Sequence, residues 1–245
     1  MVTGLSFGEF YGIDSLIELL IFAVSLQIAY YSNRIYKILK ERDYKLLSLG
    51  FLFIGLSLLF KIISNLTILE RIKIDDLYFL NHLFLEFGSL SITYLLSFSI
   101  YKFMYLIGFL FLFVMTTEIK NKKNIIMYIY LGAVTIFFSI YFNSLFHLTI
   151  ALTLAMLTMN FYENYKKVMN RNTKTVFLAF FVMMFGHLFL LFSEDLPLLY
   201  IIGKITVLIG FASLLFNQIQ INNEKKNKIG SPEGHSRTSR KGKRA

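Results

Sequence analysis

Eight ionisable side chains interrupt the apolar runs of this chain, and they are the residues best suited to chemistry. They are Glu18, Lys61, His82, Glu86, Lys102, His147, His187 and Lys204. An ionisable group near the centre of a membrane span costs about 2.5 to 3.5 kcal/mol on insertion scales. Groups that remain there despite this cost commonly mark ligand sites, ion pathways or proton relays.

The charged members of this set have signs that allow pairing. Glu18 is predicted to form an ion pair with Lys61 or Lys204, and His187 is predicted to line the same cavity. Most of the set projects onto one end of the apolar runs, which predicts a polar pocket facing outward. The pocket or ion-pair candidates are Glu18, Lys61, Glu86, Lys102, His187 and Lys204. The alternative for each lysine is a side chain that reaches the lipid headgroups.

The imidazoles allow a metal site. His82 and Glu86 are spaced four apart, so they share one face if their segment is helical. Together with His147 and His187 they form a candidate set for zinc, iron, nickel or copper. The chain has no cysteine, which excludes disulfides, thiolate metal sites and cysteine nucleophiles. The sequence identifies no cofactor.

The apolar runs that must position these residues predict an all-α membrane protein. Mean hydropathy is +0.61 and 56% of the residues are hydrophobic, above the usage typical of soluble domains. Long unbroken runs of about 20 residues favour helices over the short alternating strands of a barrel. The predicted fold is a seven-transmembrane-helix bundle with spans at about residues 13–31, 46–66, 97–117, 124–141, 148–162, 176–192 and 198–218.

The segment 77–117 leaves two topologies open. Its length would allow two crossings, which would place two of the basic stretches outside and Glu194 and Asp195 inside. A single crossing at 97–117 keeps every basic stretch on one side. We therefore predict one crossing, with residues 77–96 as an outer helical extension.

Lysine and arginine are concentrated in four stretches, at residues 34–45, 118–123, 163–174 and after Asn223. Because cytoplasmic loops retain basic residues, this rhythm predicts an external N-terminus and a cytoplasmic C-terminus. It also accounts for the net charge of +10, so no nucleic-acid partner is expected. We expect a multi-pass protein of a plasma membrane, and the abundance of Phe, Ile, Lys and Asn suggests a prokaryotic one.

The last residues, 223–245, are predicted to form a disordered basic cytoplasmic tail. Basic side chains near an anionic membrane contribute about 1 kcal/mol each to binding. The predicted anionic-lipid contacts are Lys225, Lys226, Lys228, Arg240, Lys241, Lys243 and Arg244. The lipid bilayer is therefore one expected partner.

The predicted topology resembles the seven-helix sensory modules at the N-termini of bacterial and archaeal signalling proteins. That resemblance is architectural and implies a receptor or sensor. A lysine in the last helix, Lys204, also resembles the retinal lysine of microbial rhodopsins. However, Tyr200 stands where that family has an aspartate, and the chain has no tryptophan, so we reject a retinal protein.

Three classes of function follow from these observations. The first is a receptor-like or sensor-like binding module, acting with a cytoplasmic signalling partner or as a homo-oligomer. The second is a transporter or channel subunit with its pathway along Glu18 and the span lysines. The third is a membrane enzyme with a histidine-bound metal. Phosphate-binding, zinc-protease, nucleophile-elbow and dinucleotide motifs are all missing from the sequence, which argues against an enzyme.

Overall fold

The computed structural model describes residues 7–74, 90–116, 143–193 and 196–230, together with Tyr130, Gly132, Val134, Thr135 and Phe138. Within these residues the chain is helical and contains no strand. The helices are α1 (Phe7–Leu39), α2 (Arg42–Ile74), α4 (Leu90–Thr116), α6 (Asn143–Val168), α7 (Arg171–Leu191) and α8 (Pro197–Gly230).

All six helices in the described part of the chain contain a segment long and apolar enough to cross a membrane. These segments are Asp14–Leu39, Arg42–Asn65, Leu96–Thr116, Asn143–Val168, Arg171–Leu191 and Leu198–Glu224. For the described residues the all-helical class is thus confirmed, and these helices have the length and apolar composition expected of an integral membrane protein. The predicted span at 124–141 falls mostly outside the described residues, so a count of seven remains a prediction.

The described helices contact one another in the order α1, α2, α4, α6, α7, α8, and α8 contacts α1, so together they form a closed ring. Large apolar side chains fill the interior, among them Ile54, Phe109, Leu154, Phe180 and Phe211. The ring brings the first and last helices of the chain side by side. Polar residues far apart in the sequence can therefore meet inside it.

Two neighbouring helices of the ring, α4 and α6, run in the same direction. Tyr101 and Tyr105 near the middle of α4 contact Phe146 near the start of α6. Thr116 at the end of α4 accepts a hydrogen bond from Asn160 near the end of α6, at 3.2 Å. The two helices are therefore parallel. They start in the same half of the bundle and finish at the same end.

Several helices extend past the apolar segments that predicted them. α1 continues to Leu39, beyond the predicted end at 31, and α6 starts at Asn143, where a turn before residue 148 was predicted. α8 runs to Gly230, so residues 223–230 of the predicted tail are helical. Hydropathy locates the lipid-facing part of a helix, whereas backbone hydrogen bonding continues through the charged residues that follow it.

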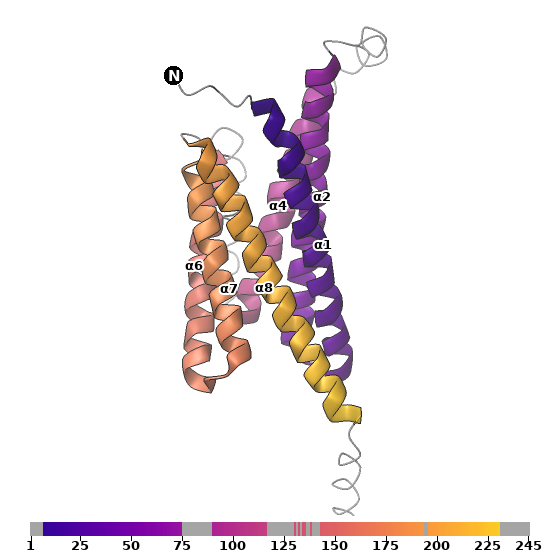
Figure 1. Cartoon of the computed structure of the whole chain (residues 1–245), viewed down its shortest axis with the longest axis vertical. Coiled ribbons are helices and arrows are strands. Elements are labelled where there is room, and N and C mark those ends of the chain that lie inside the picture. The colour runs from indigo at the N-terminus through magenta and orange to yellow at the C-terminus, as the bar shows by residue number, and fades with distance from the viewer. Residues whose placement is uncertain are drawn as a thin grey trace, which may run out of the picture.

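Two tight turns lie at one end of the bundle, which we call the basic end. One joins α1 to α2 and the other joins α6 to α7, and α8 finishes at the same end (Figure 1). The turns use left-handed backbone at Lys40 (φ 57°) and Met169 (φ 49°), which close the preceding helices. Their amides donate to the carbonyls of Tyr36 and Tyr165 at 2.8 and 2.7 Å.

Glycines allow two helix pairs to approach closely. A Cβ on Gly108 of α4 would lie 2.8 Å from the carbonyl oxygen of Gly50 on α2. A Cβ on Gly203 of α8 would lie 2.9 Å from the carbonyl oxygen of Gly186 on α7. Small residues at such contacts are typical of membrane helix pairs, where close packing replaces the hydrophobic effect as the driving force.

Candidate functional site

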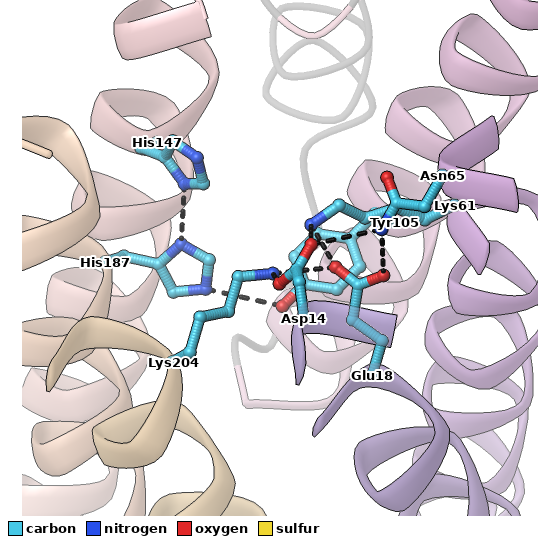
Figure 2. Close-up of polar contacts among 8 residues, drawn as sticks. All are labelled: Asp14, Glu18, Lys61, Asn65, Tyr105, His147, His187 and Lys204. Carbon is cyan, nitrogen blue, oxygen red and sulfur yellow. Dashed lines mark hydrogen bonds and ion pairs between the residues drawn. The ribbon is translucent and has the colours of Figure 1, made fainter. Parts of the chain in front are cut away.

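Four charged side chains meet between α1, α2 and α8, in the half of the bundle away from the basic end (Figure 2). We call Asp14, Glu18, Lys61 and Lys204 the ion cluster. Lys204 Nζ lies 2.8 Å from Asp14 Oδ1 and 2.7 Å from Glu18 Oε1. Lys61 Nζ pairs with Glu18 Oε1 and lies 3.8 Å from Asp14 Oδ2.

Two uncharged side chains, Asn65 and Tyr200, contact the ion cluster. Asn65 Nδ2 donates to Asp14 Oδ2 and to Glu18 Oε2, each at 3.1 Å. On α8, Lys204 Nζ also lies 5.2 Å from the centre of the Tyr200 ring. With both carboxylates ionised and both lysines protonated, the ion cluster has no net charge.

The cluster is deeply buried, because Glu18 is 0% exposed and Lys204 is 6% exposed. Transferring charges out of water is costly, and only close pairing with satisfied hydrogen bonds offsets that cost. The members therefore depend on one another. Removal of one charged side chain would leave an oppositely charged partner buried without one of its ion pairs.

Each of the three helices supplies two polar residues spaced one helical turn apart. The pairs are Asp14 and Glu18 on α1, Lys61 and Asn65 on α2, and Tyr200 and Lys204 on α8. Residues at this spacing share a helix face, so each helix presents one polar patch to the interior. Only one member of each pair, Glu18, Lys61 or Lys204, was predicted as a site residue. The repeated spacing was the signal that would have found Asp14, Asn65 and Tyr200.

A chain of three hydrogen-bonding side chains runs beside the ion cluster, from α4 through α7 to α6 (Figure 2). The Tyr105 hydroxyl lies 3.3 Å from His187 Nε2, and His187 Nδ1 lies 3.3 Å from His147 Nδ1. A hydrogen bond between two Nδ1 atoms holds a single proton. The two imidazoles therefore adopt complementary tautomers at this contact.

Lys102 occupies an aromatic site on α4. It is 1% exposed, and its Nζ lies 4.0 Å from the centre of the Phe98 ring and 5.4 Å from that of Phe146. These distances are typical of cation–π contacts, which grow stronger when the cation is removed from water. Lys102 therefore faces aromatic rings inside the bundle and not the lipid headgroups.

The structure brings together Glu18, Lys61 and Lys204 and places His187 next to His147. Glu86 and His82 lie outside the described residues, so their predicted roles in the pocket and the metal site stay predictions. Among the residues described, no group of three or more His, Asp or Glu side chains is placed to hold a metal ion.

The predicted lipid-binding residues divide between helix and tail. Lys225, Lys226 and Lys228 belong to the last turns of α8. Arg240, Lys241, Lys243 and Arg244 lie outside the described residues. Lipid contact by either group remains a prediction.

A second polar region lies at the basic end, where a cavity of about 940 Å³ opens between the helices. We call it the amide cavity, because four carboxamide side chains contribute to its lining. They are Asn160, Asn164, Asn217 and Gln218. Sequence patterning did not predict this region, because its amides are uncharged and stand out less in an apolar run than ionisable residues do.

Comparisons of this chain with protein-family models, with curated proteins and with solved structures found no match. The site must therefore be interpreted from its own geometry. That geometry is a neutral, buried ion cluster in one half of an all-helical membrane bundle and an amide-lined cavity at the other end.

Proposed function

We propose that this chain is a seven-span plasma-membrane protein that acts as a receptor-like or sensor-like binding module. In this proposal the N-terminus is outside, the C-terminus is cytoplasmic, and the ion cluster responds to a polar solute arriving from outside. A response of the cluster would be passed to a cytoplasmic partner at the basic end.

The parallel arrangement of α4 and α6 supports a seventh span between them. α4 ends at the basic end and α6 begins at the opposite end, so the 26 residues from 117 to 142 must connect the two ends. That is more than the roughly 20 residues that a helix needs to cross the hydrocarbon core. The predicted span at 124–141 would provide this crossing.

The distribution of basic residues supports the orientation. Lys37, Lys40, Arg42 and Lys45 flank the turn between α1 and α2, while Lys166, Lys167, Arg171 and Lys174 flank the turn between α6 and α7. Both turns lie at the basic end, where α8 also finishes. The positive-inside rule would place this end in the cytoplasm.

The charge-balanced pairing of the ion cluster is the observation that carries the sensor proposal. Apolar side chains would join α1, α2 and α8 without the cost of desolvating four charges. Of the four side chains, Lys61 is the most accessible, at 12%. An anionic group that reached Lys61 would compete with Glu18 and unbalance the contacts between the first, second and last helices.

The sensor proposal predicts that a change in the ion cluster moves the helices at the basic end. The chain has no cysteine, so spin labels can be attached at Lys37→Cys on α1 and Lys174→Cys on α7, which are both exposed. Pulsed electron paramagnetic resonance should show the label-to-label distance changing by roughly 1–2 Å or more in Glu18→Gln. The doubly substituted Glu18→Gln/Lys61→Met variant should return toward the wild-type distance.

Glu163→Gln is the matched control, because Glu163 is an exposed carboxylate at the basic end itself. It should leave the distance between the labels unchanged. If folded Glu18→Gln also keeps the wild-type distance distribution, the ion cluster does not communicate with the basic end and the sensor proposal fails.

A transporter is the second candidate, and the position of the amide cavity favours it. Ion pairs join α1, α2 and α8 in one half, while a cavity of about 940 Å³ opens at the other end. A transporter with its pathway open to one side would have the same arrangement. An uptake assay with wild-type protein in liposomes distinguishes the two candidates. A transporter would give net solute uptake, whereas the sensor proposal predicts none.

A further inference from the structure

The amide cavity contains buried polar atoms with unused hydrogen-bonding capacity. Within the described part of the chain, neither Nδ2 nor Oδ1 of Asn217 has a hydrogen-bond partner, and the same holds for Oε1 of Gln218. Asn217 is 0% exposed and Gln218 is 5% exposed, and both line the cavity. Buried amides are normally paired, so these atoms indicate an occupant.

The unpaired atoms define the hydrogen-bonding edge of that occupant. Asn217 Nδ2 requires an acceptor and Asn217 Oδ1 requires a donor, and the two atoms belong to one planar amide. A group that offers an adjacent donor and acceptor satisfies both at once, as an asparagine does with the edge of a nucleobase. Gln218 Oε1 accepts one further donor.

The other walls define the body of the occupant. Phe161 and Phe180 line the cavity as a stacked pair, with ring centres 4.9 Å apart and planes within 6° of parallel. Phe51 and Leu214 add apolar surface. Flat aromatic walls of this kind favour a planar apolar body over a branched or highly hydrated one.

The rim of the cavity defines its charge. Arg42 and Asp43 lie on α2, and Glu163 and Lys167 lie on α6, so each of the two helices contributes one cation and one anion. The charged side chains that line the cavity therefore balance one another. The cavity volume also lies within the range of about 300–1,000 Å³ usual for small-molecule sites.

From these features we propose that the amide cavity binds a small, uncharged, planar molecule with an amide-type edge, held by Asn217 and Gln218. Nucleosides and aromatic carboxamides share this chemistry. The site lies at the end of the bundle away from the ion cluster, so this proposal does not depend on the sensor proposal.

The test uses the full chain, purified in detergent, with two sets of probes. One set consists of adenosine, guanosine, cytidine and uridine, and the other consists of nicotinamide and benzamide. We expect at least one set to raise the melting temperature by about 2 °C or more at saturation, and calorimetry to give a dissociation constant. The set that binds shows whether the site accepts nucleosides or aromatic carboxamides.

Asn217→Leu provides the decisive variant. It should weaken binding about tenfold or more, because the paired edge is lost. It should also raise the melting temperature of the ligand-free protein by about 2–4 °C, because an unpaired buried amide is replaced by an apolar group. Gln218→Leu should weaken binding by a smaller factor.

Asn222→Leu is the matched control, since Asn222 is a buried asparagine of α8 that does not line the cavity. It should leave binding unchanged. The proposal is overturned if no probe binds the wild type, or if Asn217→Leu binds as the wild type does. It is also overturned if Asn217→Leu lowers the ligand-free melting temperature, which would show that the amide is already paired, for example by water.

Discussion

In the half of the bundle away from the basic end, each charged side chain of the ion cluster contacts an opposite charge. At the basic end, the buried amide of Asn217 has no hydrogen-bond partner among the described residues. The difference follows from the free energy of burial. An unpaired buried charge costs several kcal/mol, whereas an unpaired amide costs roughly 1–3 kcal/mol.

This contrast assigns different roles to the two regions. The ion cluster joins the first, second and last helices, so it contributes to stability as well as to any response. The amide cavity tolerates unpaired groups and an open volume, which leaves it available for a ligand. Substitutions should therefore be far more costly in the ion cluster than in the amide cavity.

The largest effect is expected for Glu18→Gln, which leaves Lys61 and Lys204 sharing the single carboxylate of Asp14. Removal of one member of a buried charge pair destabilises proteins by about 3–5 kcal/mol. Adding Lys61→Met should restore part of the loss, because Asp14 and Lys204 remain paired at 2.8 Å. Unfolding in detergent, analysed as a double-mutant cycle, measures the coupling. Independent, additive losses would show that the charges do not act as one unit.

A smaller effect is expected when uncharged partners are removed at the two ends. Asn65→Leu removes hydrogen bonds to two carboxylates, and bonds to charged groups are worth about 1.5–3 kcal/mol. Asn160→Leu removes a neutral bond to Thr116, worth about 0.5–1.5 kcal/mol. Asn65→Leu should therefore lose more stability than Asn160→Leu in the same unfolding assay. The opposite order would contradict this prediction.

In their apolar helix contacts, by contrast, the two halves should behave alike. Gly108→Ala on α4 and Gly186→Ala on α7 should each cost about 1–3 kcal/mol through overpacking. Added Cβ atoms there would lie 2.8 and 3.0 Å from backbone oxygens of the facing helices. Gly55→Ala is the control, because its nearest contact would be an ordinary 3.4 Å. Equal thermal stability of all three variants would argue against the close helix contacts.

The smallest effect is expected for truncation after Gly230, where α8 ends. The composition of residues 231–245 predicts that they add nothing to the core, so the melting temperature in detergent should stay within error. Flotation with vesicles that contain phosphatidylserine should show weaker association, because five basic residues are lost. A clear loss of thermal stability would show instead that this segment packs against the helices.

The sequence predicted part of the ion cluster and none of the amide cavity. Glu18, Lys61 and Lys204 stood out because a charge within an apolar run is a strong local signal. Asp14, Asn65 and Tyr200 were not predicted as site residues, because Asp14 lies at the edge of an apolar run and the other two are uncharged. Asn217 was not noticed, since an uncharged amide near the end of an apolar run is not exceptional.

The sequence by itself determined the helices, their membrane-spanning segments and the grouping of the basic residues, because these depend on the length and composition of local runs. Only the tertiary structure decided which charges meet. Glu18 and Lys204 are 186 residues apart and become neighbours only when α8 closes the ring against α1. It also decided that Asn217 faces a cavity, since helix periodicity defines a face but not what lies opposite it.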